Sequence, residues 1–132
     1  MGTDLNPDGP HSPEHTAEVG DLFDQCSRFL TYATMAEKRG LEYPADAYRL
    51  LGEIYSATSR LPQLCGQLTA FLAAQRDSGR LYEARGGDVG EKVAAAAYHL
   101  GLAHGASSNL TKMLKAAQAD IAGLGADEAR DA

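Results

Sequence analysis

Apolar side chains recur along this chain at the three- and four-residue spacing of α-helices, in three separate stretches. The first stretch follows Ser12-Pro13-Glu14, which has the form of an N-cap, a first-turn proline and a first-turn acid. It should end at Gly40, after Lys38 and Arg39, so we expect a helix over about 13–39. Its apolar stripe consists of Val19, Leu22, Phe23, Cys26, Phe29, Leu30, Ala33 and Ala36.

The second stretch predicts a helix over about 44–77, with Pro44 in its first turn. Its spacings alternate between four and three, which is the heptad pattern of a coiled-coil seam: Leu50, Ile54, Ala57, Leu61, Leu64, Leu68 and Phe71. A second row widens this seam on one side: Leu51, Tyr55, Cys65 and Leu72. Pro62 cannot donate a backbone hydrogen bond to the Thr58 carbonyl, so the helix should kink or split there.

The third stretch predicts a helix over about 88–123, opened by Asp88 and Glu91 as a capping box. It carries a seam in the same heptad phase: Val93, Ala96, Leu100, Ala103, Ser107, Leu110, Leu114, Ala117, Ile121 and Leu124. Two such helices joined by about ten residues should fold back as an antiparallel hairpin, with the first helix packed along its groove. The predicted fold is therefore all-α, an antiparallel three-helix bundle dominated by a long helical hairpin.

The predicted organisation is a single helical domain over 13–124, between a disordered acidic tail at 1–12 and a second disordered tail at 125–132. The hairpin register brings Pro62 near His104, where Thr58, Ser107 and Ser108 would form a polar layer. That layer is either structural, supplying a donor to the freed Thr58 carbonyl, or a ligand site. Small residues should let the two arms approach closely: Gly66, Gly101 and Gly105.

Charge is unevenly distributed along the chain. The formal net charge is −6, but residues 1–24 carry six acids and no Lys or Arg, whereas residues 25–119 carry eight acids and eleven bases. The mildly basic middle weakens any argument against nucleic acid from overall acidity. The sequence shows neither a run of apolar residues long enough for a membrane span nor the pattern of a signal peptide, so we expect a cytoplasmic protein without membrane contact.

Groups that carry chemistry are sparse. Cys26 and Cys65 occur singly on apolar faces, where core packing is the expected role. His99 and His104 are five residues apart and do not share a helix face as a metal pair would. No Ser or Cys lies in a nucleophile-elbow context, and no acids pair within the seams. We therefore expect no metal, no cofactor and no enzymatic activity.

Long apolar stripes on a bundle with a narrow core favour association with another helical surface. The leading prediction is a non-enzymatic helical interaction or assembly module, which forms a homodimer or docks onto a helical protein partner. The structural alternative is that the candidate residues only face the first helix. The candidate contacts lie on the outer flank of the second and third helices: Tyr48, Leu51, Tyr55, Tyr98 and Met113.

Four short motifs, Tyr43-Pro44, Leu51-Gly52, Leu61-Pro62-Gln63 and Gly79-Arg80-Leu81, precede the Ala-rich heptads of the third helix. With them, residues of about 43–124 resemble a group of small uncharacterised helical proteins of actinobacteria. Such proteins are often encoded within or beside mobile elements such as integrated plasmids. The resemblance implies no enzymatic activity.

The alternative function is an accessory nucleic-acid-binding protein of a mobile element, which would use the basic middle and the hairpin tip. Acids interleave with the bases at the tip, a mixture typical of a solvated surface. Asp88 and Glu91 also occupy the helix N-terminus that a phosphate would need. The candidate anion or nucleic-acid contacts are Arg76, Arg80, Arg85 and Lys92.

Overall fold

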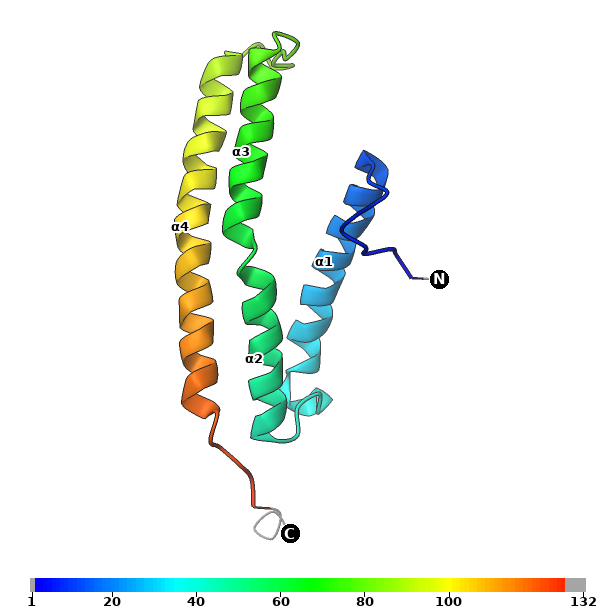
Figure 1. Cartoon of the computed structure of the whole chain (residues 1–132), viewed down its shortest axis with the longest axis vertical. Coiled ribbons are helices and arrows are strands. Elements are labelled where there is room, and N and C mark those ends of the chain that lie inside the picture. Colours follow the sequence, from blue (N-terminus) through cyan, green and yellow to red (C-terminus); the bar gives the residue numbers. More distant parts are fainter. Residues whose placement is uncertain (1, 128–132) are drawn as a thin grey trace. The chain divides into compact units, whose positions relative to one another are not determined.

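The computed structural model describes residues 2–127, and it is all-helical, with no β-strand in that range (Figure 1). The all-α prediction is confirmed. The chain divides into two compact units, 1–42 and 43–132. The first unit contains α1 (Pro13–Ala33) and the 3₁₀ turn η1 (Ala36–Lys38), and the second contains α2 (Pro44–Thr58), α3 (Leu61–Asp77) and α4 (Val89–Ile121).

Helix α1 begins where the sequence predicts and ends earlier. The Ser12 hydroxyl accepts a hydrogen bond from the His15 backbone N–H at 3.0 Å, which caps the first turn. The helix ends at Ala33 rather than near residue 39, because Met35 adopts an extended conformation, after which the chain passes through η1 to Arg39, whose φ is 56°. The Gly40 N–H then donates to the Ala33 carbonyl at 3.0 Å. A Cβ on Gly40 would overlap that carbonyl, so the turn requires glycine.

Both predicted tails lie outside the helices. Residues 2–12 contain no helix, although the Nε2 atom of His15 lies 2.6 Å from the Asp4 carbonyl oxygen. At the other end residues 124–127 are non-helical, and 128–132, which belong to the predicted tail at 125–132, lie outside the described residues. Disorder of the tails, the single domain over 13–124 and the packing of the first helix on the hairpin stay predictions.

Helices α2, α3 and α4 form the predicted hairpin, in which α2 and α3 together run antiparallel to α4 (Figure 1). Helix α4 has 33 residues and is therefore about 50 Å long. The Asp88 carboxylate accepts from the Glu91 N–H at 2.9 Å and caps its first turn. The register is set at two levels, where Thr58 meets Thr111 and Tyr48 meets Gln118.

The long arm is split at Pro62, as the sequence indicates. Helix α2 ends at Thr58, and Pro62 lies in the first turn of α3, where its missing N–H costs little. The interruption leaves backbone carbonyls without helical donors. Side chains of the same segment satisfy one of them, because the Ser56 carbonyl accepts from Arg60 Nη1 at 2.8 Å and from Ser59 Oγ at 2.7 Å.

The row of α3 that packs on α4 is not the predicted heptad seam. Leu64, Leu68 and Phe71 belong to that seam, yet 49%, 46% and 58% of their surfaces are exposed. Leu61 of that seam is half-buried, and farther along α3 the half-buried residues include Cys65 and Leu72 of the second row. The predicted seam of α4 is largely correct, since Val93 and Ser107 are the two buried residues of the described chain and most of the remaining seam is half-buried. The exceptions are exposed: Ala103, Leu110 and Leu124.

The predicted close approach at the glycines is wrong. A Cβ built on Gly66, Gly101 or Gly105 would meet no atom within 4 Å. These glycines therefore do not bring the two arms together. The close contact in the hairpin lies at Gly52, where the amide of Gln118 reaches across to the Tyr48 carbonyl.

Candidate functional site

Polar side chains form a layer across the hairpin at the end of α2, next to the break at Pro62. The Thr111 hydroxyl lies within hydrogen-bonding distance of the Thr58 hydroxyl, at 3.2 Å, and of the Ser107 carbonyl, at 2.9 Å. Thr58 donates to the Tyr55 carbonyl, and Ser107 donates to the His104 carbonyl. No buried side-chain N or O atom among the described residues lacks a partner, which favours the structural interpretation of this layer.

The composition of this layer differs from the prediction in two ways. Thr58 and Ser107 belong to it, but the His104 side chain is exposed. Thr111 was missed because the heptad phase assigns Leu110 to the seam, whereas the structure leaves Leu110 46% exposed. Thr111 could have been found from the sequence, because it follows the seam position Leu110 and the hairpin register brings it near Thr58.

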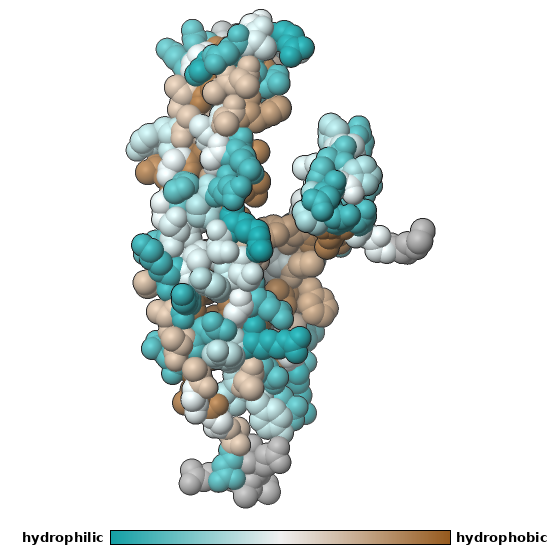
Figure 2. Space-filling view, viewed as in Figure 1, coloured by the Kyte–Doolittle hydropathy of each residue, from teal (hydrophilic) through white to brown (hydrophobic). Residues whose placement is uncertain are grey.

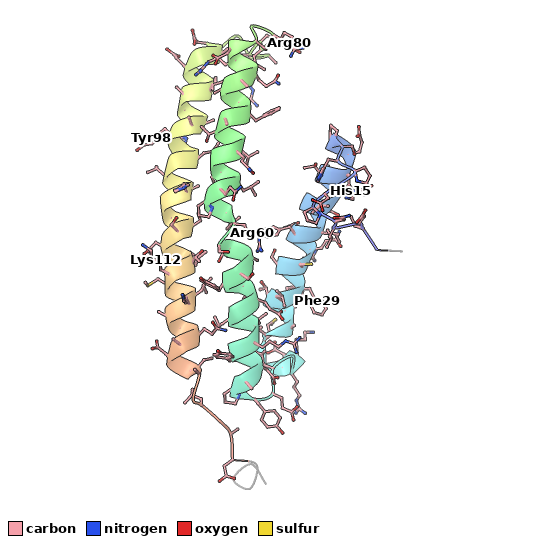
Figure 3. The ribbon with its side chains drawn as sticks, viewed as in Figure 1. His15, Phe29, Arg60, Arg80, Tyr98 and Lys112 are labelled. Atoms are coloured by element: carbon pink, nitrogen blue, oxygen red, sulfur yellow. The ribbon has the colours of Figure 1, made fainter. Side chains whose placement is uncertain are left out.

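The hairpin tip exposes the four candidate basic residues without concentrating positive charge. Arg76 pairs with the adjacent Asp77 at 3.0 Å, and in the described part of the chain Arg80, Arg85 and Lys92 form no ion pair. Arg80 lies at the tip of the hairpin (Figure 3). Residues 76–92 hold four bases and four acids. Two of those acids are engaged by backbone N–H groups, Glu83 by Arg85 and Asp88 by Glu91. The tip is therefore a charge-balanced turn.

The five candidate partner contacts are divided between different surroundings. Tyr98 and Met113 are more than half exposed on α4, and Tyr98 projects away from α3 (Figure 3). Leu51 and Tyr55 are half-buried, and the ammonium group of Lys115 lies 5.7 Å from the centre of the Tyr55 ring. Tyr48 is exposed, and its carbonyl accepts from Gln118. The structure therefore does not bring all five together on one surface.

The distal half of the hairpin carries an uncharged surface. Residues 61–75 of α3 and 93–111 of α4 contain no Asp, Glu, Lys or Arg. On α3 the exposed Leu64, Leu68 and Phe71, at i, i+4 and i+7, share one helix face, which we call the α3 stripe. On α4, Tyr98 and Leu102 are exposed in the uncharged stretch. Hydrophobic side chains also reach the surface on the face of the hairpin seen in Figure 2.

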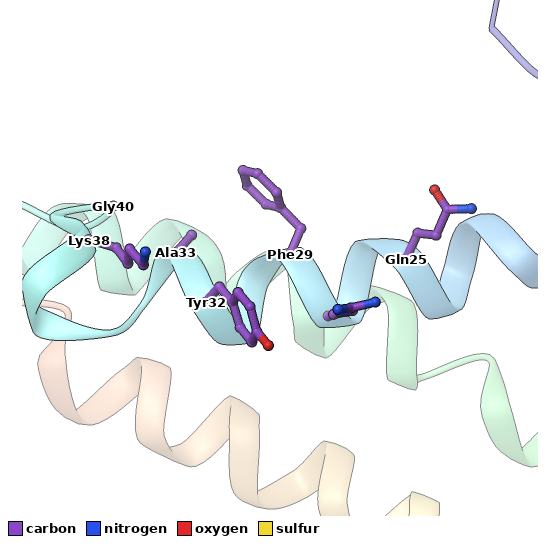
Figure 4. Close-up of a pocket in the computed structure, with 7 residues that line it drawn as sticks. Gln25, Phe29, Tyr32, Ala33, Lys38 and Gly40 are labelled. Atoms are coloured by element: carbon purple, nitrogen blue, oxygen red, sulfur yellow. The ribbon is translucent and has the colours of Figure 1, made fainter.

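A second feature lies in the first unit, where α1, η1 and the turn after it surround a surface pocket of about 580 Å³ (Figure 4). Phe29 and Tyr32 contribute largely exposed rings, and the Arg28 guanidinium lies 5.9 Å from the centre of the Tyr32 ring. The pocket contains two cations and no acid. We call it the α1 pocket, and its lining residues are Gln25, Arg28, Phe29, Tyr32, Ala33, Lys38 and Gly40.

Among the described residues, neither a metal-binding group nor a membrane-spanning helix is found. Among residues 2–127 no group of three or more His, Cys, Asp and Glu side chains is placed to hold a metal ion. No helix in that range has the length and apolar character needed to cross a membrane. Cys26 is exposed and Cys65 is half-buried, and both are free thiols, so core packing does not describe Cys26.

Comparison of the chain with models of known protein families, with curated proteins and with solved structures gives no match.

Proposed function

We propose that this protein is a non-enzymatic helical interaction and assembly module, which associates with a second helical surface through the uncharged half of its hairpin. The α3 stripe is the observation that carries the proposal. It places three large apolar side chains on one face of a helix segment that has no charged residue over 61–75. Depletion of charge around exposed apolar anchors distinguishes the centre of a protein–protein interface from ordinary surface.

The energetics indicate how large the contact must be. Each side chain of the α3 stripe already buries about half of its surface, so covering the rest would contribute roughly 1 kcal/mol apiece. Association costs at least about 4 kcal/mol in lost translational and rotational freedom. Three side chains alone are therefore too few. A stable contact must extend along the whole uncharged segment, which is about 22 Å long, and a helix of another chain laid along α3 would provide that.

Two matched substitutions on adjacent residues of α3 test this. Leu68→Glu puts a charge into the α3 stripe, whereas Gln67→Glu puts the same charge on a neighbouring exposed position that points about 100° away. We expect the full chain to sediment above its monomer mass of 14.0 kDa. Leu68→Glu should lower that mass, and Gln67→Glu should leave it unchanged.

A monodisperse monomer for the wild-type chain, or equal behaviour of the two variants, would contradict this assignment. Circular dichroism of both variants provides the control for folding, because each substituted side chain is exposed and should leave the helix content unchanged. The proposal also includes a relationship to the small helical proteins of actinobacteria and a cytoplasmic location.

A further inference from the structure

The cations of the α1 pocket are complementary in charge to the acidic N-terminal part of α1. They are Arg28 and Lys38, and neither forms an ion pair among the described residues. The preceding part of the chain, residues 1–24, carries six acids and no Lys or Arg. The part of α1 before Gln25 is acidic, and the part after it carries Arg28 and no acid, so each part attracts the opposite part of a second, antiparallel copy.

The positions of these groups on α1 allow that pairing. Glu14, Glu18, Asp21, Gln25, Arg28 and Tyr32 follow each other at spacings of four and three, so they lie on one face of the continuous helix Pro13–Ala33. Gln25 is the centre of this face. The acids lie on its N-terminal side, and Arg28, Tyr32 and the rest of the pocket lie on its C-terminal side.

We propose that α1 pairs with α1 of a second copy of this chain, antiparallel about a two-fold axis through Gln25, with the α1 pocket of each copy receiving the acidic half of the other. Asp21 and Arg28 lie one turn on either side of Gln25, so each aspartate meets the arginine of the other copy. Glu18 and Tyr32 lie two turns on either side, so each tyrosine hydroxyl donates to the other copy's glutamate.

Apolar contacts accompany these polar ones. Leu22 and Phe29 flank the same face one turn on either side of Gln25, and therefore also meet across the axis. Phe29, which is 71% exposed, stands out from α1 on the same side as Gln25 in Figure 4. Aromatic anchors beside paired charges are the combination found at well-packed interfaces.

A second copy is the occupant that this geometry favours. A two-fold interface uses the same patch on both partners, so the patch must complement itself. The α1 face does so, because reversing its direction exchanges its acidic and basic ends. This inference rests on the proposed function only in that both involve self-association, and it places a contact on a different helix.

Site-directed disulfide formation tests the geometry directly. In a chain whose native thiols are removed by Cys26→Ser and Cys65→Ser, Gln25→Cys places two thiols at the two-fold axis, within the separation of about 4.4–6.8 Å between Cα atoms that a disulfide spans. Ser27→Cys is the matched control, because residue 27 is also exposed and points to the opposite side of α1. We expect rapid dimer formation under mild oxidation with Gln25→Cys and little with Ser27→Cys.

Charge exchange tests the pairing independently. Arg28→Asp and Asp21→Arg each place like charges across the axis and should weaken dimerisation about tenfold or more. The double variant exchanges the two charges and should return to within about threefold of the wild-type dissociation constant. Equal cross-linking at both cysteine positions, or charge variants that dimerise like the wild type, would overturn the inference.

The outcomes separate this inference from the proposed function. Suppose that the wild-type chain self-associates, Leu68→Glu lowers its mass and Gln25→Cys gives no disulfide. Then the hairpin contact stands and the α1 pairing is overturned. If Leu68→Glu has no effect while Gln25→Cys is cross-linked, the α1 pairing stands alone. A wild-type chain that remains a monomer, with α1 folded against its own hairpin, overturns both.

Discussion

The hydroxyl groups of Thr58 and Thr111, 53 residues apart in sequence, hydrogen bond across the hairpin at 3.2 Å. Each group also has a carbonyl partner in its own helix, Tyr55 for Thr58 and Ser107 for Thr111. The pair lies next to the break between α2 and α3. It therefore fixes the register of the two arms at the point where the backbone of one arm is interrupted.

Replacing both threonines tests the value of this pair. Thr58→Val or Thr111→Val keeps the side-chain volume and leaves the other hydroxyl with its own carbonyl partner, so each should cost about 1 kcal/mol in free energy of unfolding. In the double variant both partners are apolar, and the loss should be smaller than the sum of the single losses. Urea unfolding followed by circular dichroism measures the four chains. Strict additivity would show that the two hydroxyls do not interact.

Glycine substitutions should have opposite effects in the first unit. Gly40→Ala places a Cβ against the backbone carbonyl of Ala33, which cannot move aside without breaking the turn, so it should destabilise this unit by about 1–3 kcal/mol. Gly20→Ala, in open space within α1, should stabilise the helix by roughly 0.5–1 kcal/mol. Thermal unfolding of the two variants against wild type is the measurement. A neutral Gly40→Ala would mean that the turn is not as described.

The Asp88 side chain, which caps α4, should contribute to the stability of the fold. The Asp88 carboxylate satisfies the Glu91 N–H, which has no partner within the helix, so Asp88→Ala should cost about 1 kcal/mol in the free energy of unfolding. Asp77→Ala removes an exposed carboxylate from the end of α3 and breaks only a surface ion pair, so it should cost much less. Hydrogen exchange of the first amides of α4 would show whether the loss is local to this end.

Nucleic-acid binding remains the alternative function. The balance of acids and bases at the tip predicts that such binding is absent. We expect no binding of short DNA or RNA duplexes at low salt, and no difference between the wild-type chain and the variant Arg80→Ala/Arg85→Ala. Binding that falls steeply with salt and is lost in that variant would establish the alternative, because phosphate contacts release counterions. Gel-shift or fluorescence-anisotropy titrations across a range of salt concentrations give this measurement.

Much of this fold is visible in the sequence because its causes are local. Ser12 and Asp88 cap helices through neighbouring residues, Pro62 interrupts the long arm through its own missing N–H, and three stretches of apolar residues at helical spacing predict the helices. The end of α1 was predicted too late, because it depends on the turn in which Gly40 folds back onto Ala33. The hydrogen bond between these two residues closes a non-helical turn, which the spacing of apolar residues along a helix does not predict.

The balance of acids and bases at the hairpin tip could also be predicted from the sequence. The candidate surfaces could not. The five predicted partner contacts are scattered because two of them, Leu51 and Tyr55, are half-buried within the hairpin unit. The α1 pocket could not be predicted, because it forms only when the turn carries Lys38 and Gly40 back alongside α1.

The sequence by itself determined the three helical stretches, the caps at Ser12 and Asp88 and the break at Pro62, since each follows from interactions within a few residues. Only the tertiary structure decided which row of α3 faces α4. Helix α3 carries two apolar rows, and rotating it about its axis leaves its own backbone hydrogen bonds unchanged, so the local energy hardly separates the two orientations. The packing of α3 against α4 distinguishes them. In that packing Cys65 and Leu72 are half-buried, and Leu64, Leu68 and Phe71 remain at the surface.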